Sequence, residues 1–239
     1  MSTVADKVVA IDVFDNVKPE FDNSYAIVAI DVIRATTTAI TAVAQGRKCY
    51  PVSSIESATE LAKKLDNPLL VGELGGNMPY GFDLQNSPFL IDSRTDVSRP
   101  MILLSTSGTR LITEFKDHDA IYPACLRNYK ALIPHLANHH TKVALIGAGT
   151  RGEFREEDQL CCAWIADGLV GLGFKPENEV TAKIIERWLQ ASVDIIRDGN
   201  SAAYLNRSGQ TQDLEFILTH VNDLDFVYQF TGDQVVKLS

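Results

Sequence analysis

YAIVAI at residues 25–30, followed by DVIRATTTAITAVAQG at residues 31–46, is the stretch that decides the fold. The first six residues are almost continuously apolar, which is typical of a strand buried on both faces of a sheet. Residues 35–45 then predict a helix, which ends at Gly46. A buried strand that leads directly into a helix is the repeating unit of α/β proteins.

Short β-branched runs and helical segments alternate in the same way along the chain up to residue 172. Further strands are predicted at residues 7–13, 48–52, 69–72, 100–104, 120–123 and 142–146. Further helices are predicted at residues 108–115, 127–137 and 156–172. Another helix is predicted to begin after Ser53 or Ser54, which caps it, and to end at residue 65. After Gly173 the pattern predicts helices at residues 177–197, 201–206 and 214–220 and short strands at residues 226–230 and 234–238.

This alternation predicts a three-layer α/β/α fold with a mixed, mainly parallel sheet. A chain of 239 residues is long enough for one large domain or two closely packed halves. We therefore expect a single unit over residues 1–239, with residues 115–140 as the place where it would subdivide.

Composition limits the class of function. The chain has 22 Lys and Arg against 31 Asp and Glu, a formal net charge of −9, which argues against nucleic acid and polybasic membrane anchors as partners. No apolar run reaches the roughly 20 residues that span a bilayer, and residues 1–6 lack the features of a signal peptide. The four cysteines have no zinc-like spacing and are typical of reduced thiols. We expect a cytoplasmic enzyme or binding protein.

Polar residues gather where the predicted strands end. Asp31 follows residues 25–30, Glu73 follows residues 69–72, and STSGTR follows the strand that ends at residue 104. In open α/β sheets, ligands bind outside the carboxyl ends of the strands. We therefore expect these groups to converge on one crevice.

The first cluster joins a carboxylate to a helix start that is rich in hydroxyls. Asp31 in this position can hold Mg²⁺, while helix N–H groups and the hydroxyls of the threonines receive phosphate oxygens; these are Thr36, Thr37 and Thr38. Arg34 can clamp an anion or pair with a surface acid. The structural alternative is that Thr36 caps the helix and Asp31 stabilises its first turn. Three consecutive threonines are poor helix formers, which favours the functional interpretation.

A second turn has the same build of hydroxyls, a glycine and a following helix. It predicts a cradle of N–H and O–H donors for an anion, formed by Ser105, Thr106, Ser107, Gly108, Thr109 and Arg110. The alternative is an ordinary strand-to-helix turn capped by serine and threonine. Two such turns in one chain favour a binding role.

Residues 147–152 (GAGTRG) match the GxGxxG pattern of dinucleotide-binding turns. The acid expected roughly 20 residues further on should end a second strand, but Asp167 lies inside an apolar helical stretch. We interpret these residues as a glycine turn that faces the same crevice, with Gly149 and Thr150 as binding candidates. A nucleotide-dependent oxidoreductase is kept as a weaker alternative.

REED at residues 155–158 supplies more carboxylates. Acids in the first turn of a helix suit its dipole. Alternatively, Glu157 or Asp158 joins Asp31 and Glu73 around Mg²⁺, which prefers oxygen ligands and is completed by substrate phosphate. The adjacent cysteines that follow have no histidine nearby in sequence, so a cysteine nucleophile is disfavoured.

Together these stretches resemble the magnesium-dependent 2-phosphosulfolactate phosphatases of coenzyme M biosynthesis. The matching segments run in family order: AIDVIRATTT (29–38), YPVSSIESA (50–58), GELGG (72–76), GFDLQNSP (81–88), LLSTSGTR (103–110), GAGTRGEFREED (147–158) and NRSG (206–209). The resemblance implies an α/β fold, Mg²⁺ as cofactor, and hydrolysis of (2R)-phospho-3-sulfolactate to sulfolactate and phosphate. It adds Asn86 to the substrate-binding candidates. Family members usually carry Arg where this chain has Leu74, a change that would remove an anion contact.

We therefore expect Mg²⁺-assisted phosphoryl transfer on a small phosphorylated acid, with Asp31, Arg34 and Glu73 as catalytic groups. Asp31 and Glu73 would hold the metal with Glu157 or Asp158, and the two cradles would neutralise charge on the phosphate oxygens. A non-catalytic anion-binding or regulatory protein would use the same cradles without turnover. A homodimer, the commonest assembly of soluble enzymes, stays open.

Overall fold

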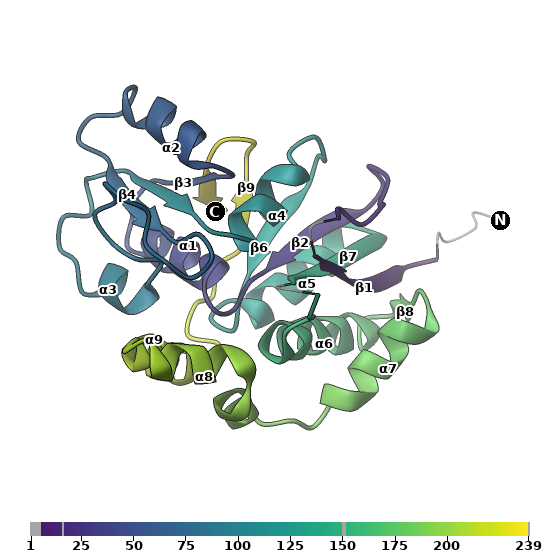
Figure 1. Ribbon diagram of the computed structural model, residues 1–239. Helices are drawn as coiled ribbons and strands as arrows, with labels where there is room; N and C mark the ends of the chain where they lie inside the picture. The colour runs from purple at the N-terminus through teal and green to yellow at the C-terminus, as the bar shows by residue number, and fades with distance from the viewer. Residues whose placement is uncertain (1–5, 16, 150–151, 239) are drawn as a thin grey trace.

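The computed structural model describes residues 6–15, 17–149 and 152–238, which form two five-stranded sheets with helices packed on their faces (Figure 1). The first sheet is parallel throughout and has the order β6-β2-β7-β1-β8. Its strands are β1 (Val8–Phe14), β2 (Ala26–Ile30), β6 (Ile121–Ala124), β7 (Lys142–Ala148) and β8 (Lys175–Pro176).

The second sheet is mixed and has the order β4-β5-β3-β10-β9. Its strands are β3 (Cys49–Val52), β4 (Leu69–Gly72), β5 (Met101–Leu104), β9 (Tyr228–Phe230) and β10 (Val235–Lys237). The first three by sequence are parallel to one another, whereas β10 runs antiparallel to both β3 and β9. The C-terminal hairpin therefore completes a sheet that begins near residue 49.

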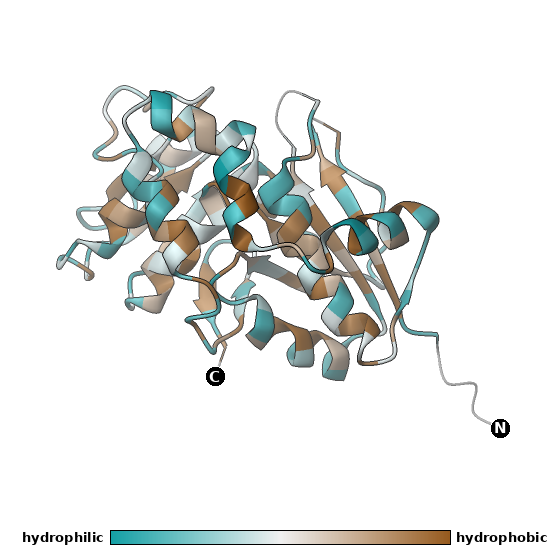
Figure 2. Cartoon of the chain, turned by 90° about the horizontal axis from the view of Figure 1, so that it is seen from below, coloured by the Kyte–Doolittle hydropathy of each residue, from teal (hydrophilic) through white to brown (hydrophobic). Residues whose placement is uncertain are grey.

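Each sheet is covered by helices on both faces, so the predicted α/β/α layering is confirmed. Between the sheets lie α1 (Ala35–Ala44) and α4 (Gly108–Glu114), which share one apolar core with both of them. The outer face of the first sheet packs on α5 (Tyr129–His139) and α6 (Glu156–Val170). The outer face of the second sheet packs on α2 (Ile55–Ala62). Figure 2 shows the apolar colouring concentrated along the strands and the inward sides of these helices.

The decisive strand behaves as its sequence predicts. All five residues of β2 are buried, and alternate residues enter the two cores: Val28 and Ile30 face α5 and α6, whereas Ile27 and Ala29 face the helices between the sheets. A residue period of two on a sheet with both faces covered requires this apolar run. The strand and the α1 helix that follows are confirmed.

The C-terminal third differs in detail from the sequence prediction. The single helix expected over residues 177–197 is two elements, α7 (Glu179–Trp188) and a 3₁₀ helix, η1 (Val193–Asp198), because Ser192 starts a new turn by accepting a hydrogen bond from the Asp194 N–H. Two more helices follow, α8 (Asn200–Arg207) and α9 (Thr211–Thr219). A short helix that the sequence prediction lacked, α3 (Pro88–Asp92), ends the long loop and is capped by Ser87.

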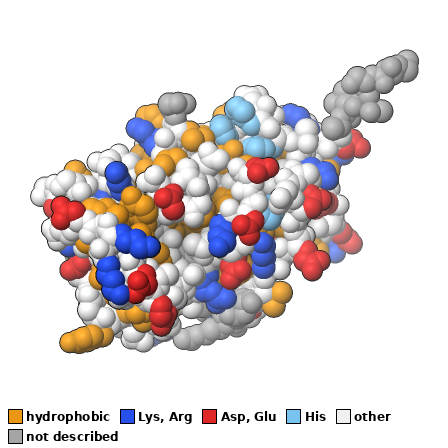
Figure 3. Space-filling model, turned by 90° about the horizontal axis from the view of Figure 1, so that it is seen from above, with side chains coloured by type: hydrophobic (Ala, Val, Ile, Leu, Met, Phe, Trp, Pro, Cys, Tyr) orange, Lys and Arg blue, Asp and Glu red, His pale blue; other side chains and the backbone are white. Residues whose placement is uncertain are grey.

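Two properties of the surface bear on partners. Among the described residues, none of the helices is both long and apolar enough to span a membrane. On the face shown in Figure 3, acidic and basic side chains are interspersed. The predictions of a cytoplasmic location, of no nucleic-acid partner, of a homodimer and of a subdivision near residues 115–140 stay predictions.

Candidate functional site

The carboxyl ends of the two sheets meet at Asp31. This residue directly follows β2 of the first sheet, whereas Gly108 opens α4 after β5 of the second. A Cβ atom added to Gly108 would lie 2.1 Å from Asp31 Oδ2 and 2.7 Å from the Cβ atom of Ala35. Only glycine allows this approach, so the turn of residues 105–108 is packed directly against the Asp31 carboxylate. The predicted convergence of two strand ends is confirmed at this point.

Three carboxylates form a buried cluster here: Asp31, Glu157 and Asp158. Burial, together with the negative charges of Glu73 and Glu157, raises the pKa of Asp31 to about 7, although the Ala35 N–H and Arg34 lower it. Burial also raises the pKa of Asp158, with contributions from Glu157 and Asp31. The pKa of Glu157 is raised by burial as well. We call these three residues the carboxylate cluster.

Backbone contacts hold the carboxylate cluster in place. Asp158 Oδ1 accepts a hydrogen bond of 2.7 Å from the Val32 N–H, which ties the first turn of α6 to the end of β2. Glu157 accepts a hydrogen bond from Ser201 of α8. Like charges are thus held close together by donors from two different segments, the end of β2 and α8, an arrangement that favours either protonation or a bound cation.

Glu73 has a different role from the cluster, because hydrogen bonds engage both of its oxygens. Its Oε1 accepts from the Thr106 N–H at 2.7 Å, and its Oε2 accepts from Thr106 Oγ1 at 2.9 Å and from the Gly76 N–H at 2.8 Å. Thr106 Oγ1 in turn accepts from the Gly75 N–H. Glu73 therefore fastens the start of the long loop to the second cradle, close enough to Asp31 to influence its pKa.

Arg34 lies buried beside Asp31 and is paired with the C-terminal helices. Its Nη1 donates to Asp213 Oδ2 at 2.6 Å and to Gln210 Oε1, and both side chains of the ion pair are only 4% exposed. Asp213 Oδ1 accepts from Ser87 Oγ, the cap of α3. The strand end, the long loop and α9 are therefore joined by one buried polar network.

The three threonines of the first cradle direct their hydroxyls into the backbone. Thr36 Oγ1 donates to Asp31 O at 2.7 Å, Thr37 Oγ1 to Val32 O at 2.8 Å, and Thr38 Oγ1 to Arg34 O at 3.1 Å. All three residues are buried. These bonds stabilise the start of α1, which has no side-chain cap. Phosphate binding by these three residues stays a prediction.

The second cradle is only partly closed. Ser105 and Thr109 exchange hydrogen bonds, with Thr109 N–H donating to Ser105 Oγ and Ser105 N–H to Thr109 Oγ1. Among the described residues, by contrast, the side chains of Ser107 and Arg110 have neither a hydrogen bond nor an ion pair. The Arg110 guanidinium lies over the ring of Phe14, 5.6 Å from its centre. Ser107 and Arg110 are therefore the donors that this turn leaves available.

The glycine-rich turn after β7 is explained by packing. A Cβ atom at Gly147 would lie 2.2 Å from the Phe154 ring, and one at Gly149 would lie 2.9 Å from the Cβ atom of Asp15. Both glycines thus allow close approach to neighbouring segments, which accounts for the GxGxxG match without a nucleotide. Thr150 lies outside the described residues.

Two further candidates lie in the long loop. Asn86 is buried next to Ser87, and its Oδ1 has no hydrogen-bond partner among the described residues. Leu74 forms a tight turn in which its N–H donates to Asn77 O and the Asn77 N–H donates back. Leu74 thus stabilises the turn through its backbone, and its side chain carries no positive charge that could bind an anion.

Sequence reasoning missed the contribution of α8 and α9. Tyr204 Oη donates to Gly76 O at 2.6 Å, and Gln210 and Asp213 bind Arg34. An acid in the first turn of a helix is common because it suits the helix dipole, so nothing in sequence distinguishes Asp213. The only signal was the NRSG stretch at residues 206–209, which connects these two helices.

A pocket of about 390 Å³ opens beside the carboxylate cluster. Its walls are the first turn of α6, Arg187 of α7, and the start of α8 at Gly199 and Asn200, and Glu157 belongs to both the pocket and the cluster. Arg187 is paired there with Glu156 at 3.0 Å. The pocket gives the cluster an approach from solvent.

The carboxylate oxygens of the cluster are the type of ligand atom that Mg²⁺ prefers. No group of three or more Asp, Glu, His or Cys side chains in the described part of the chain is arranged to hold a metal ion. Mg²⁺ commonly binds one or two carboxylates and completes its shell with water and substrate phosphate, so a preformed three-ligand cage is not required. The carboxylate cluster offers oxygen atoms alone and has unfavourable charge repulsion that a divalent cation would relieve.

Comparison with known proteins gives one consistent result. The family described as 2-phosphosulpholactate phosphatase matches residues 5–233 of the chain. A "Probable 2-phosphosulfolactate phosphatase" of Symbiobacterium thermophilum is 33% identical over 88% of this chain and 93% of its own length. Similar proteins with the same description are 31% identical in Caldanaerobacter subterraneus (84% of this chain, 86% of the relative) and 29% identical in Clostridium perfringens (87% of each).

Proposed function

The chain belongs to the 2-phosphosulfolactate phosphatase family and is a phosphatase, and we propose that it hydrolyses a small phosphorylated acid of the 2-phosphosulfolactate type with the help of Mg²⁺. In this reaction (2R)-phospho-3-sulfolactate and water give 3-sulfolactate and phosphate. The observation that carries the proposal is the buried carboxylate cluster, which lies directly against a turn with unpaired donors.

The carboxylate cluster is where the metal would bind. Asp31 would be a ligand together with Asp158 or Glu157, and the remaining positions would be filled by water and substrate phosphate. When bound, Mg²⁺ would polarise the phosphoryl group and lower the pKa of a water molecule. Glu73 would contribute indirectly, because its oxygens already accept three hydrogen bonds that hold the loop in place.

The arginines and hydroxyls would stabilise charge on the transferring phosphoryl group. Arg110 and Ser107 have free donors at the second cradle, and Arg34 is fixed beside Asp31. Phosphoryl transfer depends mainly on positioning and on donors aimed at the phosphoryl oxygens, so fixed donors in a water-poor site contribute strongly.

The substrate also has a second acidic group, a sulfonate or a carboxylate, that the site must bind. Leu74 provides no cation for a sulfonate at the position where the resemblance leads us to expect Arg. We propose that the remaining arginines of the site bind this group, so that a carboxylate and a sulfonate would both be accepted.

The test is a phosphate-release assay over 2-phosphosulfolactate, 2-phospholactate and 2-phosphoglycerate, with Mg²⁺ and with EDTA. We expect Mg²⁺-dependent release from at least one of them, and a loss of about 10²-fold or more in kcat for Asp31→Asn. Asp96→Asn, far from the cluster at the amino ends of the strands, is the matched control and should retain activity. Absence of release at every Mg²⁺ concentration would contradict the proposal and favour a non-catalytic anion-binding protein.

A further inference from the structure

The guanidinium group of Arg34 is only half used by the protein. Its Nη1 donates to Asp213 and to Gln210, which occupies both hydrogens of that nitrogen. Nε and Nη2 have no hydrogen-bond partner among the described residues, and neither nitrogen is fully buried. The side chain is nevertheless only 4% exposed. Three N–H groups of a nearly buried side chain are therefore left without an acceptor among the described residues.

This unused part of the guanidinium has the shape that binds an anion. The Nε–H and the nearer Nη2–H are parallel, and together they match two oxygens of a phosphate or carboxylate. Neither nitrogen is among the fully buried unpaired atoms of the described residues, so both remain accessible to a ligand that would accept hydrogen bonds from them. Arg34 also lies close enough to Asp31 to lower its pKa, which places the group at the carboxylate cluster.

Asp213 is fixed as firmly as the arginine it holds. Its Oδ2 accepts from Arg34, while its Oδ1 accepts from Ser87 Oγ and, at 3.2 Å, from the Phe89 N–H. Its side chain is 4% exposed. The partners come from two other segments, the end of the long loop and the end of β2. Asp213 thus has no freedom to follow a mobile arginine and instead determines where Nη1 lies.

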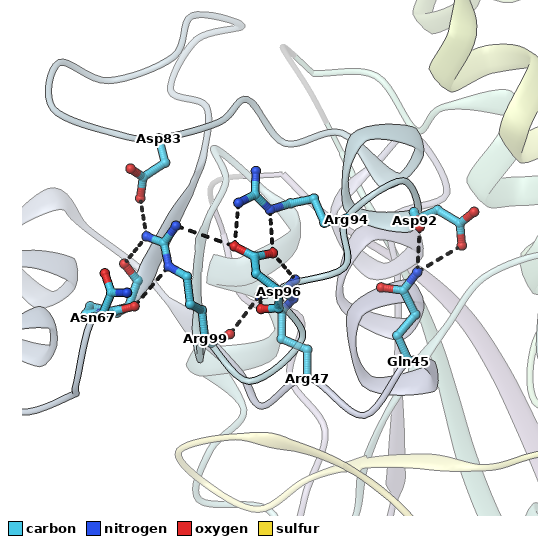
Figure 4. Close-up of polar contacts among 9 residues, drawn as sticks. Gln45, Arg47, Asn67, Asp83, Asp92, Arg94, Asp96 and Arg99 are labelled. Carbon is cyan, nitrogen blue, oxygen red and sulfur yellow. Dashed lines mark hydrogen bonds and ion pairs between the residues drawn. The ribbon is translucent and has the colours of Figure 1, made fainter.

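A second arginine of the chain shows what a purely structural pair looks like. Arg47 is fully buried at the amino ends of β3 and β5, and Figure 4 shows it among Asp96, Arg94 and Arg99. Its Nη1 donates to two backbone carbonyls, Asp96 O and Arg99 O, and its Nη2 donates to Asp96 Oδ1. Among the described residues, both terminal nitrogens of Arg47 donate hydrogen bonds and its Nε is buried without a partner, whereas only Nη1 of Arg34 is engaged and its Nε and Nη2 are not fully buried. What distinguishes Arg34 is that its unengaged side is accessible, as expected if that side serves a ligand.

We propose that Asp213 is a positioning residue, which clamps Nη1 of Arg34 so that the Nε and Nη2 side is held for the phosphoryl oxygens of the substrate. This inference rests on the proposed function. It makes α9 part of the anion-binding apparatus, although Asp213 lies 179 residues from Arg34 in sequence and does not itself touch the phosphate.

The test is a double-mutant cycle read by binding of inorganic phosphate to the full-length protein with Mg²⁺ and by kcat/KM. Asp213→Asn should weaken phosphate binding about tenfold, because the neutral amide holds the guanidinium less firmly. In an Arg34→Ala background the same change should have no further effect, since Asp213 acts through Arg34. Effects that add in the double variant, or an unchanged dissociation constant in Asp213→Asn, would overturn the inference.

Two controls separate positioning from loss of stability. Asp96→Asn weakens the Arg47 pair, so it should lower the unfolding temperature and leave phosphate affinity unchanged. Gln210→Leu removes only the second acceptor of Nη1; it should weaken phosphate binding about threefold and keeps the inference testable if Asp213→Asn fails to fold. A wild-type chain that binds phosphate without turnover would refute the proposed function alone. A failed cycle in an active enzyme would refute the role of Asp213 alone.

Discussion

The two cradles have the same build in sequence and opposite states in the structure. In the first, residues 31–38, every threonine hydroxyl donates to a backbone carbonyl and Arg34 is paired with Asp213. In the second, residues 105–110, Ser107 and Arg110 have neither a hydrogen bond nor an ion pair among the described side chains. Both begin against the same carboxylate, that of Asp31.

This difference separates two ways of supplying a cation to an anion site. The first cradle is a rigid, buried support that holds one arginine in place through a partner on α9. The second offers an arginine that rests on the Phe14 ring and is free to meet a ligand. Hydroxyl-rich turns alone therefore do not identify a binding site; the hydrogen bonds that remain unmade do.

Substituting the arginine of each cradle tests most directly whether the two cradles differ in their contribution to stability. Arg34→Ala leaves Asp213 as a buried unpaired charge, so we expect the free energy of unfolding to fall by about 3–5 kcal/mol. Arg110→Ala loses only an interaction with an aromatic ring, and we expect a fall below about 1 kcal/mol. Urea denaturation of both variants measures the difference. Equal losses would show that the two arginines contribute equally to the free energy of unfolding.

The shared carboxylate makes stability depend on pH. Burial raises the pKa of Asp31 to about 7, above the value of roughly 3.9 in an unfolded chain. Between about pH 4 and pH 7 the unfolded chain loses this proton while the folded chain keeps it. The contribution of Asp31 to the free energy of unfolding of the metal-free protein should therefore fall over that range, by about 4 kcal/mol, and level off above it. Denaturation in EDTA measures this, and Asp31→Asn should flatten the curve; an unchanged slope would contradict the raised pKa.

The second cradle should contribute to catalysis through Arg110. Arg110→Ala should lower kcat/KM by about 10²-fold, which corresponds to about 2.7 kcal/mol of transition-state stabilisation, with the fold intact. Arg110→Lys keeps the charge and should recover part of the activity. Steady-state kinetics on the best substrate measures both variants. Full activity in Arg110→Ala would show that Arg110 does not contact the phosphoryl group.

The smallest effect is expected inside the first cradle. Thr37→Val has nearly the same shape but loses the hydrogen bond to Val32 O, so we expect a loss of about 1 kcal/mol in stability. Its kcat/KM should stay within about twofold of wild type. Thr37→Ser, which keeps the hydroxyl, is the matched control. A large loss of activity with unchanged stability would mean that this hydroxyl contacts the phosphate, and the first cradle would then resemble the second.

Local sequence patterns predicted the parts of the fold that depend on near neighbours. The apolar run of β2, the α1 helix and the convergence of Asp31 with the turn of residues 105–108 follow from strand burial and from the rule for strand ends. Asp213 could not be found in this way, because its role exists only through a contact with Arg34 across 179 residues. The split of residues 177–197 was missed for a different, local reason: the Ser192 cap competes with the helical period of the surrounding residues.

The hairpin of β9 and β10 has a consequence for how the protein matures. Val235 of β10 pairs with Cys49 of β3, so the second sheet gains these strands only after about 190 further residues have been translated. Asp213, which holds Arg34, is also made late. The strands of the first sheet up to β7 precede residue 150, so they can pair before α9 supplies the contact between Asp213 and Arg34.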